Sequence, residues 1–310
     1  MTLPDATVRD LTVRGLRYRY RVLPCPAPRT EPVVLLGGAL QGIHGWPQMD
    51  AHLGPHADVV TVDLPGMGDA DPLPAEGGGD DLLCEAVTGV LDDLGAERVN
   101  LFGFSYGTTM AFGCARRNPG RIARLALGGV PAHIGDEQRE RWAAAIARLH
   151  AGDAEGLAAL ASDVLLCTDP ERPVHRRALA RSYVRRAFVH ALTRSPHAER
   201  SLIRALGHRP DFSGGLSGVP ALVFAGEHDT VTSAERQRAF AATIEGSRFL
   251  TIGESDHWVV LERSEDVAEL VTRFFTDRPL ESAAALRPVA PLPRPRTADA
   301  ALPTGGRGVR

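Results

Sequence analysis

The chain has 310 residues, of which 44% are hydrophobic and 24% are charged, and its formal net charge is −3. This composition is ordinary for a globular protein, and the lack of a basic excess excludes a nucleic-acid partner bound by bulk electrostatics. No run of about 18 apolar residues occurs, which excludes a membrane-spanning helix and a membrane partner.

The cysteines and the start of the chain indicate the compartment. Cys25, Cys84, Cys114 and Cys167 form no C-x-x-C pair and no zinc-like spacing, and they are too sparse for a disulfide framework. The first residues, MTLPDATVRDLTVRG, lack the apolar segment of a secretion signal. We therefore expect free thiols, a cytoplasmic location, no bound metal and no cofactor, while the oligomeric state stays open.

Apolar patterns divide the chain into strands and helices. Residues 7–23 alternate polar and apolar side chains, which predicts a hairpin of half-buried strands. Continuous apolar runs, typical of strands buried on both faces, lie at 33–36, 59–62, 99–102, 124–127, 221–224 and 248–252. Helical spacing of apolar residues predicts helices over 80–94, 106–118 and 264–276. This alternation predicts an α/β fold with a doubly wound, mostly parallel sheet and an active site at the carboxyl ends of its strands.

Two segments interrupt the alternation. Residues 131–215 are rich in Arg, Ala and His and carry no strand pattern, which predicts an inserted helical cap. Residues 279–310 are rich in Pro, Ala and Arg without periodicity, which predicts a disordered tail. The expected core therefore comprises residues 1–130 and 216–278.

A candidate nucleophile lies between a predicted strand and a predicted helix. Gly103-Phe104-Ser105-Tyr106-Gly107 is a G-x-S-x-G sequence in the context that this motif requires. A sharp strand-to-helix turn strains the serine backbone, and only small flanking residues let the chain pass so closely. The helix N-terminus beneath the serine offers amides to a developing oxyanion.

A serine hydroxyl needs a base and an acid, which follow it in the chain in the order acid, then histidine. Asp229 and His257 both lie on loops directly after predicted strands, so we expect them to complete a triad. Asp229 could instead cap a helix or form a turn, and Glu227 is an alternative acid. His228 is an alternative base, although its side chain would point away from the adjacent acid, and Asp256 is interpreted as a turn residue.

Taken together, these segments resemble the α/β-hydrolase-fold enzymes, in particular the cap-bearing esterase, peroxidase-like and aminopeptidase-like group. The resemblance covers roughly residues 10–278 and rests on LLGGALQG (35–42), DLPGMGDAD (63–71), GFSYGTTMAFGCARRNPGRIARLAL (103–127), VFAGEHDTV (223–231) and ESDHWVVLE (254–262).

The resemblance implies a reaction and the residues that perform it. Ser105 would attack a carbonyl as His257 takes its proton, and the backbone amides of Ala39 and Tyr106 would hold the oxyanion. The family's first strand usually ends in His-Gly, whereas this chain has Gly37-Gly38. That departure leaves the triad intact but puts the loop geometry around Ala39 in doubt. The DLPG sequence at 63–66 corresponds to a structural turn of the family.

Three residues near these motifs are candidates for substrate binding: Gln41, His44 and Trp258. Gln41 and His44 could equally be loop residues that face water, and Trp258 could simply pack. The cap carries many arginines, which could attract an anionic substrate or form a solvated helix face. These include Arg176, Arg177, Arg181, Arg185 and Arg186.

The expected activity is hydrolysis of an ester, thioester or lactone, for which thioester release or another tailoring step of a biosynthetic pathway is one version. The expected partner is a small-molecule acyl substrate, either free or bound to a carrier. A lyase or C–C bond-cleaving enzyme, an acyltransferase and a ligand-binding module remain alternatives, because fold does not settle function. Relatives that use a carboxylate nucleophile are disfavoured, since Ser105 occupies that position.

Overall fold

A computed structural model describes residues 5–74, 79–132, 135–195, 197–283 and 285–287. Within them one sheet contains β1 (Thr7–Val13), β2 (Leu16–Leu23), β3 (Val33–Leu36), β4 (Val59–Asp63), β5 (Val99–Phe104), β6 (Ile122–Gly128), β7 (Ala221–Gly226), β8 (Arg248–Ile252) and β9 (Leu286–Arg287). Their order in the sheet is β1-β2-β4-β3-β5-β6-β7-β8-β9. The run from β4 to β8 in this order is parallel, whereas β1, β2 and β9 are antiparallel to their neighbours. The predicted hairpin and mostly parallel sheet are confirmed.

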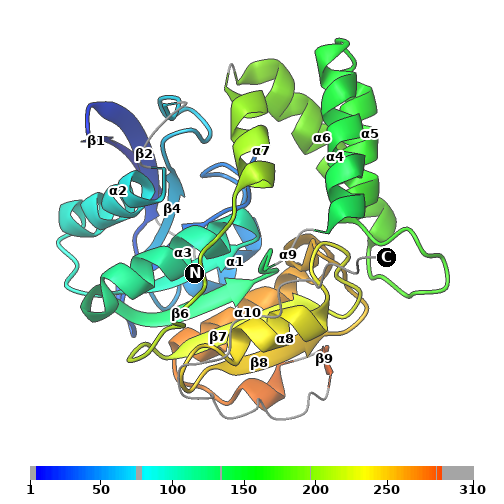
Figure 1. Ribbon diagram of the computed structural model, residues 1–310. Helices are drawn as coiled ribbons and strands as arrows, with labels where there is room; N and C mark the ends of the chain where they lie inside the picture. Colours follow the sequence, from blue (N-terminus) through cyan, green and yellow to red (C-terminus); the bar gives the residue numbers. More distant parts are fainter. Residues whose placement is uncertain (1–4, 75–78, 133–134, 196, 284, 288–310) are drawn as a thin grey trace.

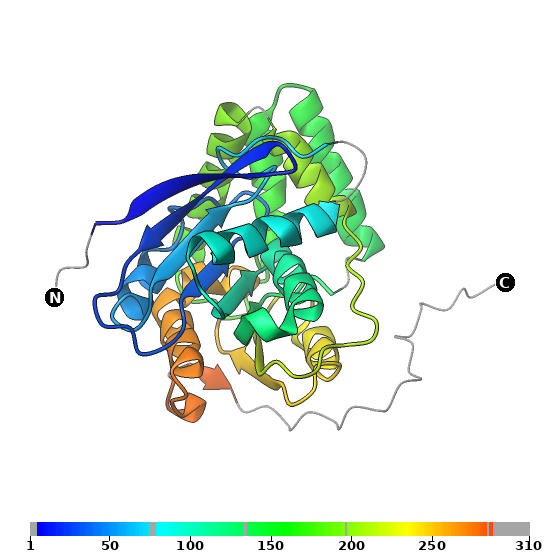
Figure 2. The ribbon, with the colours of Figure 1, turned by 90° about the vertical axis from the view of Figure 1, so that its left-hand side faces the viewer.

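Helices cover both faces of the sheet (Figures 1 and 2). One face packs against α2 (Gly79–Asp93), α3 (Tyr106–Arg117) and α8 (Ala234–Ala241). The other packs against α1 (Pro47–Leu53), the short α9 (Val259–Glu262) and α10 (Ser264–Phe275). One turn of 3-10 helix, η1 (Pro119–Arg121), precedes β6. The doubly wound arrangement inferred from the alternation is therefore present.

The parallel strands have continuous apolar sequences because neighbouring side chains point to opposite covered faces. In β3, Val34 and Leu36 belong to the hydrophobic cluster under α2 and α3, whereas Val33 and Leu35 belong to the cluster under α1 and α10. All four side chains are at most 1% exposed. Burial of both faces at once explains why these strands lack the alternation seen in β1 and β2.

Four further helices rise above the sheet between β6 and β7 (Figure 1). They are α4 (Asp136–His150), α5 (Ala154–Leu165), α6 (Arg177–Arg194) and α7 (Ala198–Gly207), and all fall within the segment 131–215. Trp142, Phe188 and Leu202 form part of a separate hydrophobic cluster there, against which Leu40 and Trp258 of the core pack. None of the described helices is long and apolar enough to cross a bilayer.

The ordered chain extends beyond residue 278, where the sequence predicted the core to end. The 3-10 turn η2 (Leu280–Ser282) and strand β9 follow, and β9 pairs with β8 through Leu286 opposite Ile252. Leu280 is 1% exposed and packs into the cluster of α10. Ala283 packs into the same cluster, and Arg287 pairs with Glu227, so tertiary contacts hold a segment whose composition has no periodic signal. The rest of the predicted tail, 288–310, lies outside the described residues.

Candidate active site

The turn from β5 into α3 holds Ser105 in a backbone conformation that favours glycine, with φ 50° and ψ −122°. Its two flanking glycines have no room for a side chain. A Cβ at Gly107 would lie 2.1 Å from the carbonyl oxygen of Leu36, and a Cβ at Gly103 would lie 2.7 Å from that of Gly107. Close passage of Gly107 against β3 and of Gly103 against the start of α3 therefore requires glycine at both positions, as the motif predicted.

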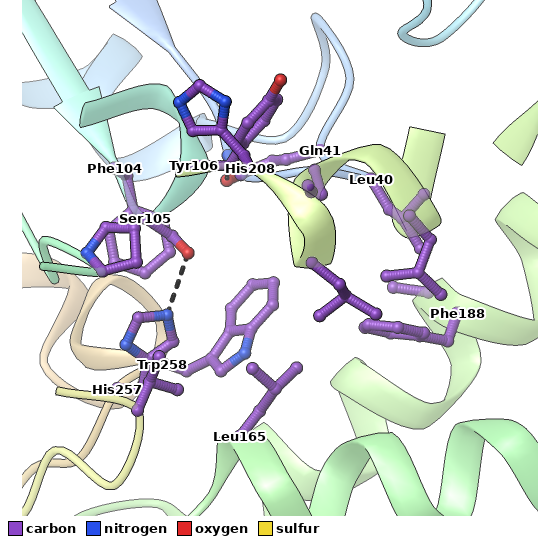
Figure 3. A pocket seen from close by; sticks show the side chains of 18 of the residues that line it. Leu40, Gln41, Phe104, Ser105, Tyr106, Leu165, Phe188, His208, His257 and Trp258 are labelled. Carbon is purple, nitrogen blue, oxygen red and sulfur yellow. Dashed lines mark hydrogen bonds between the residues drawn. The ribbon is translucent and has the colours of Figure 1, made fainter. Parts of the chain in front are cut away.

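The structure brings the three predicted triad residues together. Ser105 Oγ lies 2.9 Å from His257 Nε2, a contact marked by the dashed line in Figure 3. His257 Nδ1 lies 3.1 Å from Asp229 Oδ2. Asp229 follows β7 and His257 follows β8, so the carboxyl ends of neighbouring parallel strands supply both groups. His257 and Asp229 are almost fully buried, whereas Ser105 is partly exposed toward a pocket.

The Asp229 carboxylate is held by several donors besides His257. Oδ1 accepts from the backbone N–H groups of Val231 at 2.9 Å and Thr232 at 3.0 Å. Oδ2 also accepts from Gln237 Nε2 at 2.9 Å. These donors fix the orientation of the carboxylate beside His257 Nδ1. Nothing in the sequence pattern singled out Gln237, which lies on α8 and reaches Asp229 only through the fold.

The alternative acids and base lie elsewhere. The Glu227 carboxylate accepts from the Glu254 amide at 2.9 Å and from Arg287 at 3.2 Å. The His228 Nε2 atom lies 3.9 Å from Glu227 and makes no contact with Ser105. Asp256 is more than the turn residue that the sequence suggested, because it is fully buried and bonded to the cap. None of these groups replaces Asp229 or His257 in the observed arrangement.

The two residues predicted to supply oxyanion amides, Ala39 and Tyr106, lie beside the nucleophile. Ala39 lies in the turn after β3, where a Cβ on the neighbouring Gly38 would be 3.7 Å from Ser105 Cβ. Tyr106 is the first residue of α3, so its N–H has no acceptor within the helix. Ala39 and Tyr106 both line the pocket beside Ser105. The loop that carries Gly37-Gly38 therefore lies next to the serine, and the oxyanion role of the two amides stays a prediction.

A pocket of about 980 Å³, its open mouth included, separates the sheet from the cap above Ser105. Aliphatic and aromatic side chains dominate its walls (Figure 3). Among the described residues that line it there is no arginine, aspartate or glutamate. The core contributes Gly38, Ala39, Leu40, Gln41, Phe104, Ser105, Tyr106, Pro131, Val231, His257 and Trp258, and the cap segment contributes Trp142, Leu165, Tyr183, Ala187, Phe188, Leu202, Ala205, Leu206, His208 and Pro210.

Two of the three predicted substrate-binding residues line this pocket. Gln41 does so while its Oε1 accepts from the Gly38 amide at 3.2 Å, which steadies the loop before Ala39. Trp258 lies beside His257 and reaches toward Leu165 of the cap (Figure 3). Its indole N–H is buried and has no acceptor among the described residues.

The prediction for His44 does not agree with the structure. His44 is exposed and is absent from the pocket walls, although Ile43 beside it is buried. His208, which the sequence did not single out, lines the pocket instead. It stacks edge-on against Tyr106 with ring centroids 5.5 Å apart, and burial lowers its pKa from the ordinary value of 6.5.

The cap arginines point away from the pocket. Arg181 pairs with Asp163, and Arg177 donates to the carbonyl of Asp169 at 2.8 Å. Arg181, Arg185 and Arg186 line a shallow groove on the outer side of α6, whereas Tyr183 and Phe188 of the same helix face the pocket. The helical period separates these two sets, so the arginines do not contribute charge to the pocket walls.

The chain belongs to the α/β hydrolase fold family, whose sequence profile matches residues 31–264. This family membership places the chain among the α/β-hydrolase enzymes and, in general terms, among the serine hydrolases. The 2-hydroxy-6-oxononadienedioate/2-hydroxy-6-oxononatrienedioate hydrolase 2 of Pseudomonas putida is 38% identical over 103 residues, which are 32% of this chain and 36% of that protein. The hydrolase of the same substrates from Klebsiella pneumoniae is 26% identical over 285 residues, which are 87% of this chain and 96% of that protein. The first of these matches spans about a third of the relative's length.

Solved structures share the fold. An esterase from Thermogutta terrifontis superposes with a TM-score of 0.72 at 22% identity and covers 87% of this chain and 98% of its own. The enol-lactonase from Burkholderia xenovorans LB400 superposes with a TM-score of 0.70 at 24% identity and covers 86% and 100%, respectively. At these identities the likeness extends to the fold, and the chemistry must be argued from the site itself.

Proposed function

We propose that this chain is a serine hydrolase that cleaves an uncharged, largely apolar ester, thioester or lactone through an acyl-enzyme on Ser105. The observation that carries the proposal is the Ser105–His257–Asp229 chain of contacts, 2.9 and 3.1 Å long, opening onto a pocket whose described walls hold no arginine or carboxylate. Such walls accommodate an apolar acyl group and leave an ionised one without a partner.

The proposed reaction gives each of the three residues one role. Ser105 Oγ attacks the acyl carbon while His257 Nε2 takes the hydroxyl proton, and the carbonyl electrons move onto oxygen beside the Ala39 and Tyr106 amides. When the carbonyl re-forms, the alcohol or thiol leaves with the proton from His257. Water then gives a proton to His257 and attacks the acyl group, which releases the acid and regenerates the Ser105 hydroxyl. Asp229 stabilises the imidazolium throughout.

A second candidate is C–C bond hydrolysis by the same three residues. The names of the relatives favour it, because an oxo-dienedioate has no ester bond and its hydrolysis must break a C–C bond. Those substrates are dicarboxylates. An apolar pocket penalises a buried carboxylate unless a cation or several donors meet it. The polar side chains of the described walls carry no permanent positive charge, so the uncharged acyl substrate is the better match. Besides the nucleophile they are Gln41, Tyr106, Trp142, Tyr183, His208, His257 and Trp258.

The test compares substrates on one enzyme preparation. Wild type and Ser105→Ala would be assayed against p-nitrophenyl esters of acetate, butyrate and octanoate, an acyl thioester, an aliphatic lactone and a 2-hydroxy-6-oxo-dienedioate. Labelling by a fluorophosphonate, read as intact mass, reports whether Ser105 is activated without reference to any substrate. Ser105→Ala is expected to lose the label and at least about 10³-fold in kcat/KM.

The outcomes separate the two candidates. Turnover of butyrate or octanoate esters, thioesters or lactones well above that of the dienedioate supports the proposal. Preference for the dienedioate by tenfold or more would replace it with C–C bond hydrolysis. If folded wild type neither labels nor turns over any compound, serine-based catalysis itself is contradicted.

A further inference from the structure

The residue before the candidate base carries a carboxylate that is 0% exposed. Asp256 Oδ2 accepts from the backbone N–H of Cys167 at 2.7 Å, and Oδ1 accepts from that of Trp258 at 3.0 Å. The second bond closes a turn across His257, and the first reaches the segment between α5 and α6 of the cap. One buried carboxylate therefore ties the loop of the base to the cap that roofs the pocket.

A second buried carboxyl group supports the first. Glu262 of α9 is 1% exposed, and its Oε2 accepts from the Asp256 backbone N–H at 2.7 Å. Its other oxygen, Oε1, is buried and meets no donor among the described residues. Burial first, and then the charge of Asp256, raise the pKa of Glu262 to about 9. Two carboxyl groups in contact in a dry site share one proton, because both cannot be ionised there without a large cost.

The charged groups around this pair do not neutralise it. His257 on the same loop lowers the pKa of Asp256, but it lowers it less than burial raises it. On the cap side, Arg177 of α6 acts on Glu262 from a distance while its guanidinium donates to carbonyls at 169 and 172. The buried thiol of Cys167 lies at the same junction. On the far side of α9, Arg263 pairs with Glu254 and Asp266 and does not reach the pair.

We propose that Asp256 and Glu262 form a positioning pair, which shares one proton and holds the His257 loop and the cap in the arrangement that the reaction needs. The pair acts through His257 and touches no reacting atom. This inference rests on the proposed role of His257 as the base. As pH rises through about 9, Glu262 loses its proton, the two carboxylates repel, and the bonds to Cys167 and Trp258 weaken. His257 then loses its fixed orientation, and the cap loses its hydrogen bond to the His257 loop.

The variant Glu262→Gln removes the ionisation of this side chain while it keeps its size and shape. A glutamine keeps a donor for the Asp256 carboxylate and an acceptor for the Asp256 amide, but it does not ionise. We expect activity within about threefold of wild type near pH 7, and loss of the fall in kcat/KM that wild type shows above pH 9. Asp256→Asn keeps only one acceptor oxygen, and we expect a decrease of about 10- to 100-fold at neutral pH, as for a displaced catalytic group.

The experiment measures two quantities against pH for wild type, Glu262→Gln and Asp256→Asn. The first is the rate constant for fluorophosphonate labelling of Ser105, which needs no known substrate. The second is hydrogen-exchange protection of the Cys167 amide, which needs no catalysis. Glu265→Gln removes an exposed carboxylate from the neighbouring helix and is the matched control. Circular dichroism at each pH confirms that the variants are folded.

Wild type should lose labelling rate and Cys167 protection together as pH rises through 9, and Glu262→Gln should retain both. An alkaline loss that is identical in wild type and Glu262→Gln would overturn the inference, as would full labelling by folded Asp256→Asn. If wild type fails to label at every pH, the proposed function has failed. The exchange data then still decide whether the pair anchors the cap, because protection that is independent of pH and of Glu262→Gln overturns the inference.

Discussion

Gln237 donates from Nε2 to Asp229 Oδ2 at 2.9 Å, the same oxygen that lies 3.1 Å from His257 Nδ1. The same nitrogen donates to the carbonyl of Thr232 at 2.8 Å, and Gln237 Oε1 accepts from the Val130 amide at 2.8 Å. The side chain is fully buried. One amide therefore joins the acid loop after β7 to the chain that leaves β6.

Replacing Gln237 by leucine should affect both stability and activity. The Val130 N–H would lose the acceptor that Gln237 supplies, which lowers the free energy of unfolding by about 1–3 kcal/mol. With one donor fewer, Asp229 would hold the imidazole less firmly, and we expect a decrease of about 10-fold or more in labelling rate. Urea unfolding and fluorophosphonate kinetics measure the two effects. Gln48→Leu, on the exposed side of α1, is the control, and equal behaviour of the two variants would remove Gln237 from the site.

Asp229→Asn tests the acid directly. The side chain keeps its size, but an amide beside His257 Nδ1 no longer stabilises an imidazolium and can select the wrong tautomer. We expect a decrease of about 10⁴-fold in kcat/KM with little change in KM. Steady-state kinetics on the best ester, with Glu227→Gln as the control for the alternative acid, measure it. A larger effect at Glu227 than at Asp229 would reassign the triad.

Gly107→Ala tests the tight passage of the nucleophile turn against β3. The added Cβ would lie 2.1 Å from the Leu36 carbonyl oxygen, so backbone has to move at the point that holds Ser105. We expect a loss of several kcal/mol in unfolding free energy, or loss of the folded state. Gly120→Ala in η1 meets nothing within 4 Å and should stay within about 0.5 kcal/mol of wild type. Thermal and urea unfolding compare the pair, and similar values would show that the turn can relax.

The substitution Asp63→Asn should change how the free energy of unfolding depends on pH. Asp63 Oδ1 accepts from the Ile43 amide at 3.0 Å, and burial raises the pKa of this carboxyl above its ordinary value of 3.8. A raised folded-state pKa means that the contribution of Asp63 to stability is complete below the unfolded pKa and is lost as pH rises through the folded pKa. Asparagine does not titrate there.

The free energy of unfolding of Asp63→Asn minus that of wild type should therefore increase from about pH 4 to about pH 7, so the variant gains stability relative to wild type. Urea unfolding at both pH values measures the difference. The exposed Glu245→Gln should show no comparable trend. A relative stability of Asp63→Asn that falls over the same range would mean that the ionised carboxylate is the form that the fold prefers.

Trp258→Phe tests the unpaired donor in the pocket. The Trp258 indole N–H is buried without an acceptor among the described residues, so a substrate oxygen is its expected partner. We expect kcat/KM to fall about 2- to 10-fold for esters that carry an ether or carbonyl oxygen in the acyl chain, and to change less for alkyl esters of equal length. Matched pairs of p-nitrophenyl esters measure this difference. An equal decrease for both members of a pair would indicate a packing role.

Local patterns were sufficient to predict the sheet and the three residues that meet at its carboxyl edge. The apolar runs at 33–36 and 99–102 are buried strands because both sheet faces are covered, and G-x-S-x-G marks a turn whose glycines the backbone requires. Asp229 and His257 follow the neighbouring strands β7 and β8, and Ser105 follows β5, which β6 separates from β7 in the same parallel run, so all three residues leave the sheet at its carboxyl edge.

Tertiary structure decided the rest. Gln237 and Glu262 contact the site from helices, and a helix shows in its sequence which residues are apolar but not which buried polar residue meets which loop. His44 was predicted to bind substrate and faces solvent, while His208 lines the pocket from the cap. The cap sequence predicts helices, but which of their side chains face Ser105 depends on how those helices pack. The catalytic motifs directly follow strands and can be recognised in short stretches of sequence. The pocket walls are formed by residues far apart in the chain, which only the tertiary structure brings together.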